Sequence, residues 1–331
     1  MTLTLYHRED HELARLVLSD AERDELERLW RELHFVSGDA LQLVDAYEQL
    51  WQYATQDADP SAFEPLRQPI LDAAAAHRAD LVAAEPVHLE ALLAWARRAW
   101  RRPLAPAEQA AIRDLYARLR AEGIDHDPAV RTLLARVLVA PSFLYHLEEA
   151  PPGDRPGPVD DHALAARLAA FLWSSVPDDE LAELADSGRL RDPAILAGQV
   201  ERMLRDDRVA RLARQFGCQW LHVADFDTLD EKSPAHFPEF AQLRGSMQEE
   251  AVRFFTAFFQ GDKPVRWLLD ADETSVDASL EAFYGGTQPA PEAPPGNWHP
   301  LEGMQARGRG GILGLAAVLA RQSGASRTSP I

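Results

Sequence analysis

The sequence predicts an all-α protein, an irregular multi-helix bundle in two sub-bundles with a short carboxy-terminal extension. Apolar residues recur at helical spacing through most of the chain, whereas the alternating pattern of a half-buried strand is scarce. The chain has 331 residues, of which 46% are hydrophobic and 26% are charged. A chain of this length corresponds to about two domains and can bury a large core without disulfides or metals.

Start and stop signals mark the helices of the amino-terminal part. Ser19 and Glu22 have the spacing of a capping box ahead of the segment DELERLWREL. Pro86 and Pro106 fit the first turns of two later helices, and Gly123 fits the end of the second of these. Between Glu22 and Pro86, one apolar face predicts a further helix, formed by Leu43, Val44, Tyr47, Leu50 and Trp51.

Two Asp-Pro pairs predict further helix starts. Asp127-Pro128 and Asp192-Pro193 each have an N-cap residue followed by a proline, which fits the first turn of a helix. The helix after Asp127 continues through the segment VRTLLARVLVA.

Two segments rich in proline and glycine, Ala150–Val159 and Gly285–Gly296, interrupt the helical pattern. Such segments cannot continue a helix, so we expect irregular or flexible breaks there. The expected organisation is an amino-terminal helical region (1–96), a small helical domain (97–149), a central helical domain (160–284) and a carboxy-terminal piece (304–331).

Charge and cysteine content exclude several classes of function. The formal net charge of −19 argues against nucleic-acid binding. Residues 304–331 nevertheless contain four arginines and no acidic residue, which indicates either a solvated stretch or a surface for an anionic partner. Because Cys218 is the single cysteine, the chain can form neither an internal disulfide nor a covalent haem attachment. No signal peptide and no membrane-spanning segment are recognisable in the sequence.

A series of short phrases in the second half of the chain resembles the planctomycete-type cytochrome-associated multidomain proteins, which are built from domains of unknown function. The resemblance covers about residues 97–147 and 160–331. Its phrases are Phe171–Asp179, Leu184–Pro193, Gln199–Leu204, Gln219–Leu221, Phe237–Phe240, Met247–Glu250, Leu268–Asp272, Gly310–Leu319 and Arg327–Pro330.

The resemblance implies a Cys-x-x-Cys-His haem motif beyond Arg327–Pro330. Since the sequence ends at Ile331, residues 304–331 are expected to be the start of a truncated cytochrome-linked domain, with c-type haem in the region that follows. No cofactor is expected within this chain. The resemblance also implies cytochrome c domains as partners, in cis or in trans, and a periplasmic or other extracytoplasmic location.

Four acidic residues are weak candidates for catalysis. Glu249 and Glu250 precede a helix face rich in phenylalanine, so one of them is expected at the edge of that face, as a general acid or base or as an ion-pair partner. Asp270 and Asp272 belong to an acidic cluster that could bind a hard cation, but its spacing is not that of an EF-hand. We predict no metal site.

Three residues near the carboxyl end are weak candidates for cofactor binding. Arg327 could position a haem propionate or a substrate carboxylate. Thr328 and Ser329 could take part, or could instead cap a helix that follows.

Other candidates favour structural roles. Cys218 and His222 are four residues apart, as metal ligands on one helix face can be, but we expect a buried and inert thiol. His7 and His11 have the same spacing and are not expected to bind metal. Three tryptophans of the central part are predicted to be core residues: Trp173, Trp220 and Trp267. The arginines around Trp100 (Arg97, Arg98, Arg101 and Arg102) are expected on a solvated helix face.

Two hypotheses of function follow from these observations. In the first, the chain is the helical body of an exported, c-type-cytochrome-linked redox or electron-transfer protein whose reaction is unknown. In the second, it is a non-catalytic scaffold or interaction module that holds cytochrome domains. A hydrolase is disfavoured, because the sequence contains no nucleophile-elbow or triad pattern.

Overall fold

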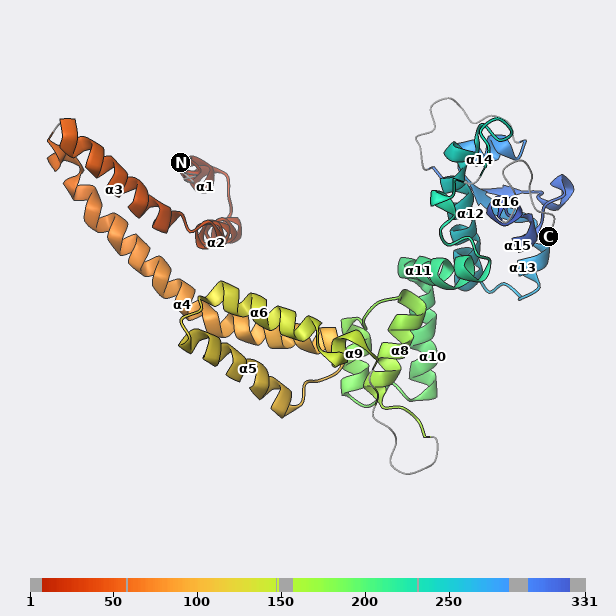
Figure 1. The fold of residues 1–331 in the computed structure, drawn as a ribbon, viewed down its shortest axis with the longest axis horizontal. Helices are drawn as coiled ribbons and strands as arrows, with labels where there is room; N and C mark the ends of the chain where they lie inside the picture. The colour runs from red at the N-terminus through yellow and green to blue at the C-terminus, as the bar shows by residue number, and fades with distance from the viewer. Residues whose placement is uncertain are drawn as a thin grey trace. The chain divides into compact units, whose positions relative to one another are not determined.

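A computed structural model describes residues 8–57, 59–146, 148, 157–230, 232–285 and 297–321. Helices dominate these residues and a single two-stranded sheet accompanies them, so the predicted all-α class is confirmed (Figure 1). The chain forms two compact units, one of residues 1–96 and 104–138 and the other of residues 97–103 and 139–331. No helix within the described ranges is both long enough and apolar enough to cross a membrane.

The first unit is entirely helical over its described residues. Its elements are α1 (His11–Leu16), α2 (Asp20–Ser37), α3 (Asp39–Asp57), the 3₁₀ turn η1 (Pro60–Phe63), α4 (Glu64–Trp100), α5 (Pro106–Ala121) and α6 (His126–Leu138). The predicted capping box at Ser19 is confirmed, because the Ser19 amide donates to the Glu22 carboxylate (2.9 Å) and the Glu22 amide donates to the Ser19 hydroxyl. Gly38 then ends α2 in the left-handed conformation (φ 62°).

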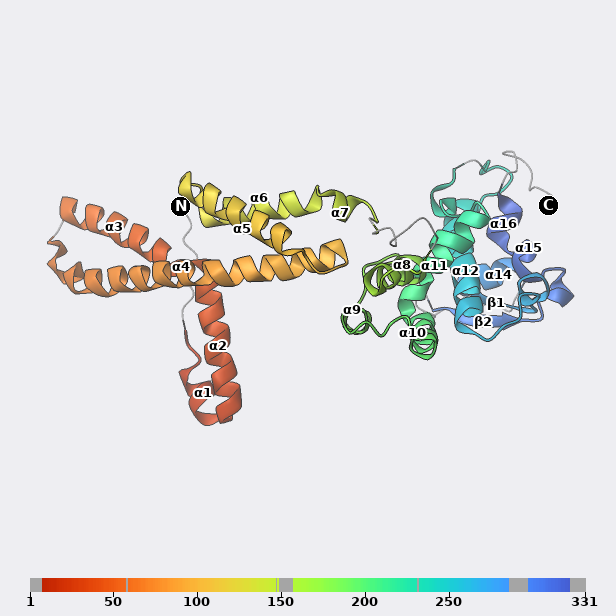
Figure 2. The same ribbon diagram turned by 90° about the horizontal axis from the view of Figure 1, so that it is seen from below.

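Helices α5 and α6 lie along the second half of α4 (Figures 1 and 2). Buried aliphatic side chains join the three helices: Leu92, Leu93, Ile112 and Leu133. At the edge of this contact Glu85 accepts hydrogen bonds from the Tyr116 hydroxyl and from Arg120, both 2.8 Å long. Two predictions hold here, since Pro106 is the first residue of α5 and Gly123 (φ 82°) follows the end of that helix.

The predicted helix starts at Pro86 and Asp127 are wrong. Pro86 lies inside α4, a 37-residue helix that also contains Pro69. An interior proline removes one backbone hydrogen bond, and the side chains buried on both sides of Pro86, such as Ala74 and Leu92, keep the helix continuous. Helix α6 begins at His126, so Asp127 lies in its first turn. The first amides of a helix have no partner within it, and Pro128 therefore costs no hydrogen bond at that position.

The second unit contains a cluster of helices and a mixed region. Its elements are α7 (Pro141–Leu144), α8 (Asp161–Trp173), α9 (Asp179–Asp186), α10 (Pro193–Arg205), the 3₁₀ turn η2 (Asp207–Val209), α11 (Ala210–Leu212), the π-helix η3 (Ala213–Cys218), the 3₁₀ turn η4 (Phe226–Thr228), α12 (Phe240–Gln260), α13 (Trp267–Asp270), β1 (Glu273–Val276), α14 (Ala278–Phe283), β2 (His299–Glu302), the 3₁₀ turn η5 (Gln305–Arg307), α15 (Gly311–Gly314) and α16 (Ala316–Ala320). The predicted start at Asp192-Pro193 is confirmed, because Asp192 caps α10 by accepting from the Ala194 amide (2.9 Å).

Trp173 is the centre of the core formed by α8, α9 and α10. Its ring is fully buried, and its indole N–H donates to the Met203 carbonyl (2.9 Å). The guanidinium carbon of Arg208 lies 3.4 Å from the ring centroid, and that of Arg202 lies 5.5 Å away. Arg202 also donates to both carboxylate oxygens of Asp178 (2.8 and 3.1 Å). The phrases Phe171–Asp179 and Gln199–Leu204 thus supply one structural cluster.

Helix α12 organises the rest of the unit. Strand β1 pairs with β2 in antiparallel register, with Thr274 opposite Leu301, and both α14 and α16 pack against α12. The π-helix η3 crosses α12 where Gly217 faces Phe255. The two predicted breaks, Ala150–Val159 and Gly285–Gly296, lie outside the described residues except for 157–159 and 285.

Gly217→Ala is expected to destabilise the second unit by about 1–3 kcal/mol, because a Cβ atom at this position would overlap the Phe255 ring. Gly198→Ala is the matched control, since Gly198 lies within α10 and a Cβ atom there would have no other atom within 4 Å. Urea denaturation of both variants tests this expectation. Equal urea midpoints for the two variants would show that the Phe255 ring moves aside without a measurable loss of stability.

Candidate functional site

Glu249 and Glu250 are neighbours on α12 but lie in two different environments. One of the two was expected at the edge of the aromatic face, but Glu250 lies deeper than an edge position, because its side chain is fully buried (0% exposed). Glu249 is half-buried and pairs with Arg253 (3.0 Å), which is the ion-pair role considered for this pair. The candidate site is therefore the environment of Glu250.

Three segments from later in the chain bring donors to the Glu250 carboxylate. The Thr274 hydroxyl on β1 donates to Oε1 (2.8 Å), and the Tyr284 hydroxyl after α14 donates to Oε2 (2.7 Å). The Ala316 amide at the start of α16 lies 3.4 Å from Oε2 and 3.2 Å from the Tyr284 hydroxyl. Glu250 thus connects α12 to the sheet, to the end of α14 and to α16.

Burial raises the pKa of the Glu250 carboxyl to about 7, against an ordinary value of 4.5. Desolvation of the charged form is the largest cause, and the hydrogen bonds from Tyr284 and Thr274 oppose it. Burial and the adjacent carboxylate raise the pKa of the Tyr284 hydroxyl as well. A carboxyl with a pKa near 7 is suited to general acid–base chemistry, but both oxygens of Glu250 are bonded to protein donors and neither faces solvent.

An apolar pocket of about 260 Å³ lies beside this network, and it shares Ala316 with it. Its walls come from the segment before α12, from α12 itself and from α16, with Phe237, Phe240, Leu243, Met247 and Leu319 as apolar lining residues. Lys232 and Arg309 are its basic lining residues, together with His236. The sequence phrases Phe237–Phe240 and Gly310–Leu319 contain several of these residues, but their meeting at one pocket could not be predicted.

Asp270 and Asp272 do not form a site with their acidic neighbours. Asp270 pairs with Arg266, and Asp272 accepts from the Gln305 amide (2.7 Å). Glu273 pairs with Lys263 and Asp277 caps α14, so each carboxylate serves a separate contact. Within the described ranges no three side chains of metal-binding type converge.

Cys218 is buried as predicted, at the end of η3. Burial raises the pKa of its thiol to about 11. His222 is exposed and itself adopts a left-handed backbone conformation (φ 56°). The expected core role of Trp220 is wrong, because the residue is 53% exposed. Trp220 follows the π-helix η3 and stacks on Phe216, which is also exposed.

The Cys218 thiol is expected to react with Ellman's reagent only when the second unit unfolds. At pH 8 a thiol with a pKa of about 11 is almost entirely protonated, and its burial excludes the reagent. The measurement compares native protein with protein in about 6 M guanidinium chloride, where the reaction should be complete. Rapid reaction of the native protein would show that η3 opens readily.

Arg101 has a specific structural role that the sequence pattern did not indicate. It adopts a left-handed backbone (φ 59°), and its guanidinium donates to the carbonyls of Ser142, Phe143 and Tyr145 at 3.0–3.2 Å. Arg97 pairs with Asp186. Arg101 is therefore not on a solvated face, because it holds the end of α7. The candidates Arg327, Thr328 and Ser329, like His7, lie outside the described residues.

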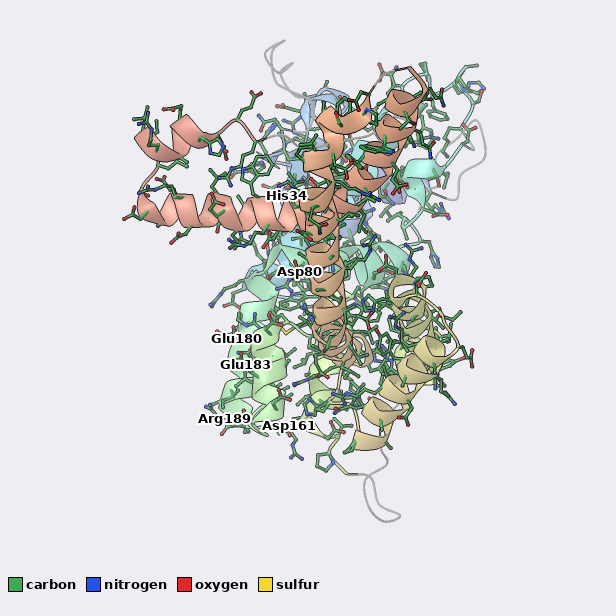
Figure 3. All side chains as sticks on the ribbon, turned by 90° about the vertical axis from the view of Figure 1, so that its left-hand side faces the viewer. His34, Asp80, Asp161, Glu180, Glu183 and Arg189 are labelled. Carbon is green, nitrogen blue, oxygen red and sulfur yellow. The ribbon has the colours of Figure 1, made fainter. Side chains whose placement is uncertain are left out.

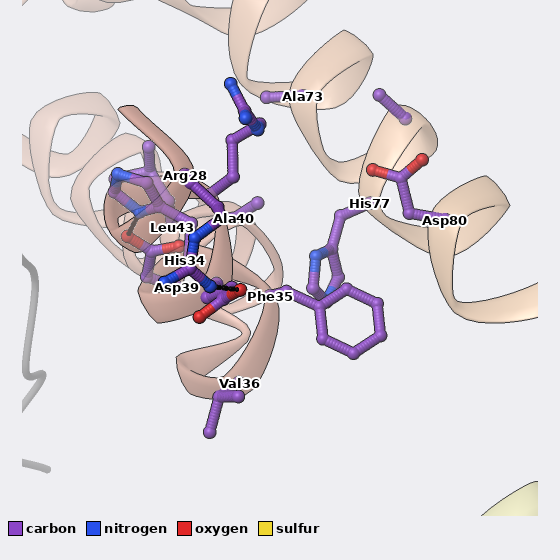
Figure 4. A pocket seen from close by; sticks show the side chains of 13 residues that line it. Arg28, His34, Phe35, Val36, Asp39, Ala40, Leu43, Ala73, His77 and Asp80 are labelled. Atoms are coloured by element: carbon purple, nitrogen blue, oxygen red, sulfur yellow. Dashed lines mark hydrogen bonds and ion pairs between the residues drawn. The ribbon is translucent and has the colours of Figure 1, made fainter. Parts of the chain in front are cut away.

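A larger hollow, of about 1160 Å³, lies in the first unit among α2, α3 and α4. His34 on α2 donates through Nδ1 to Asp39 (2.6 Å), and Phe35 lies beside the buried His77 of α4 (Figure 4). Asp80 stands one turn beyond His77 on α4 (Figure 4). The hollow was not predicted, because it depends on how three helices meet.

A further hollow, of about 560 Å³, lies between α9 and α10 of the second unit. Glu180, Glu183 and Arg189 line it (Figure 3). The Gln199 amide donates to Glu180 (2.7 Å) across the hollow. Glu180 is thus engaged in holding the two helices together.

These features define an all-α protein of two units, with a buried carboxylate network in the second. Residues 159–285 match the family model described as a protein of unknown function, DUF1592, and residues 89–148 match that of another, DUF1595. No curated protein and no solved structure shows a significant match. The chain thus contains two domains of unknown function, as the predicted resemblance requires, while the link to cytochromes stays a prediction.

Proposed function

We propose that the chain is a non-catalytic helical interaction module that holds c-type cytochrome domains in an extracytoplasmic redox assembly. In this proposal the partner domains carry the haem and the electrons, because covalent attachment requires two cysteines and the chain has only Cys218. The two matched domains of unknown function and the sequence phrases of the second unit support the assignment to such assemblies.

The observation that carries the proposal is the uncovered apolar surface of the first unit. Helices α1 and α2 contain no buried residue, although α2 has an amphipathic pattern. Val36, at the edge of the 1160 Å³ hollow, is 83% exposed, and Leu29 and Tyr53 are also exposed. Val36 lines the hollow together with Phe35 and Leu43, and an uncovered apolar surface of this kind is typical of a protein interaction site. The net charge of −19 favours a partner with a basic surface.

The Glu250 network argues against catalysis by the second unit. A general acid or base must reach its substrate directly or through one water molecule. Glu250 is fully enclosed, and Thr274, Tyr284 and Ala316 occupy its oxygens. Its geometry supports a structural role in holding four segments together.

The test is binding of the chain to the c-type cytochrome domains encoded by the same gene or by neighbouring genes, measured by calorimetry. Val36→Asp should weaken binding about tenfold or more, because it places a charge in the apolar surface. Val265→Asp is the matched control, since Val265 is 75% exposed in the second unit and distant in sequence from the hollow. Equal effects of the two substitutions, or no binding by the parent protein, would overturn the proposal.

Self-association is a separate outcome of the same experiment. If sedimentation shows that the chain forms dimers and Val36→Asp abolishes them, the surface pairs two copies and the cytochrome partner is wrong.

A further inference from the structure

The 260 Å³ pocket beside Glu250 combines an apolar interior with basic groups. Phe240, Leu243 and Met247 of α12 form one side and are buried, while Leu319 and Ala320 of α16 form another. Pockets that take small molecules are typically apolar with a few polar groups that fix the orientation of the ligand. The volume of about 260 Å³ is just below the range of about 300–1,000 Å³ for drug-sized ligands, so only a smaller ligand fits.

Arg309 is held in a fixed position at this pocket. Its guanidinium carbon lies 4.7 Å from the ring centroid of Tyr284 and 5.8 Å from that of Phe283. Its Nη1 donates to the Gly314 carbonyl (3.1 Å), and this is its one hydrogen bond to a described residue. The remaining N–H groups present a planar fork of the kind that binds a carboxylate through two oxygens.

Lys232 adds a second positive charge to the pocket wall. It is only 6% exposed, and its Nζ lies 5.9 Å from the ring centroid of Phe237. Lysine is rare in this chain, which contains only Lys232 and Lys263, and lysine side chains are seldom buried. Glu239 is the acidic residue among those that line the pocket, and it is exposed. Lys232 and Arg309 thus place two cationic side chains on the pocket wall of a chain with a net charge of −19, while the enclosed Glu250 carboxylate acts on the charge of Arg309 from behind Tyr284.

We propose that the pocket is a binding site for a small monocarboxylate with an apolar body. The carboxylate lies at Arg309, with the charge of Lys232 on the same wall, and the apolar body packs against the phenylalanine, leucine and methionine side chains. The other polar side chains among the described lining residues, His236 and Glu239, are both exposed, so they do not offer a second polar contact deep in the pocket. A single acidic head on an aromatic or branched aliphatic body matches this arrangement.

The experiment uses 3-phenylpropionate as the probe and 3-phenylpropanol as its uncharged counterpart. Calorimetric titrations at pH 7.5 should show that the acid binds at least about tenfold more tightly than the alcohol, because only the acid pairs with the basic groups. Arg309→Met and Lys232→Met should each weaken binding of the acid about tenfold or more and leave the alcohol unchanged.

Each variant has a matched control of the same residue type outside the pocket. Lys263→Met removes the other lysine, which pairs with Glu273, and Arg307→Met removes a neighbouring arginine that does not line the pocket. Both controls should bind the acid normally. Leu319→Trp, which fills the pocket from its half-buried side, should abolish binding of both compounds.

Circular dichroism spectra and melting temperatures identify any variant that fails to fold. Three outcomes would overturn the proposal: equal affinity for acid and alcohol, no binding of the acid at about 10 mM, or equal loss of affinity in Lys263→Met and Lys232→Met. Retained binding in Leu319→Trp would place the probe elsewhere and would also overturn it.

Discussion

The free energy of unfolding of the native protein is expected to fall by about 3 kcal/mol as the pH rises from about 4.5 to 8, because Glu250 loses its proton. Glu250→Gln is expected to abolish this fall. The carboxyl has a pKa of about 7 when folded, against 4.5 as its ordinary value. Because the folded state binds this proton more tightly than the unfolded chain does, the stabilisation is complete below pH 4.5. It is lost as the pH rises through 7. Glutamine has nearly the same shape and does not titrate.

The free energy of unfolding of the second unit should be measured at several values of pH between 4.5 and 8, by urea denaturation. Glu249→Gln is the matched control, because Glu249 is the adjacent residue and is only half-buried. Relative to that of Glu250→Gln, the free energy of unfolding of both the native protein and Glu249→Gln should decline as the pH rises over this range. Parallel profiles for all three proteins would show that Glu250 titrates near its ordinary pKa.

The position of Glu250 shows what the sequence could predict about the site. Met247 precedes it by three residues and Phe254 follows it by four, which places Glu250 on the buried face of α12. The same spacing puts Glu249 beside Arg253, on the side of the helix that bears the ion pair. The helical pattern therefore indicated that Glu250, and not Glu249, would be the buried member of the pair. Its partners Thr274, Tyr284 and Ala316 are 24, 34 and 66 residues away, and no local pattern indicates them.

The same division between local and tertiary effects separates the correct helix starts from the wrong ones. Asp192 caps α10 through amides two and three residues away, so the signal and the structure lie within one turn. The outcome at Pro86 depends on whether packing compensates for an interior proline. That compensation comes from residues such as Ile112 and Leu133 on other helices, and it is not visible in the sequence around Pro86.

The tryptophans illustrate the same limit for the core. Trp173 and Trp220 were both predicted to be core residues. Trp173 is buried as predicted, whereas Trp220, which follows the π-helix η3, is exposed. A π-helix adds one residue to a turn, and Gly217 allows its close approach to Phe255. The identity of Gly217 is a signal for this contact, but it indicates close packing without indicating the partner.

Trp173→Ala is expected to destabilise the second unit by about 3–5 kcal/mol, the largest effect of any single substitution that we predict. The substitution leaves a cavity at a fully buried site and frees the Met203 carbonyl from its indole donor. It also removes the ring that Arg208 and Arg202 cover. Amide hydrogen exchange of peptides from α8, α9 and α10 reports this stability without assuming that the two units unfold together.

Two further variants separate the contributions at Trp173. Trp173→Phe keeps an aromatic ring but lacks the N–H, so its smaller cost, about 1–3 kcal/mol, reports the unpaired Met203 carbonyl and the volume lost. Trp220→Ala removes the same type of side chain from a surface where half of it is exposed, and it should cost about 1 kcal/mol. If Trp173→Ala costs no more than Trp220→Ala, the cluster of Trp173, Arg202 and Arg208 does not stabilise the fold. The presence of the phrases Phe171–Asp179 and Gln199–Leu204 in this chain would then have to be explained by binding to a partner, because packing around Trp173 would not explain it.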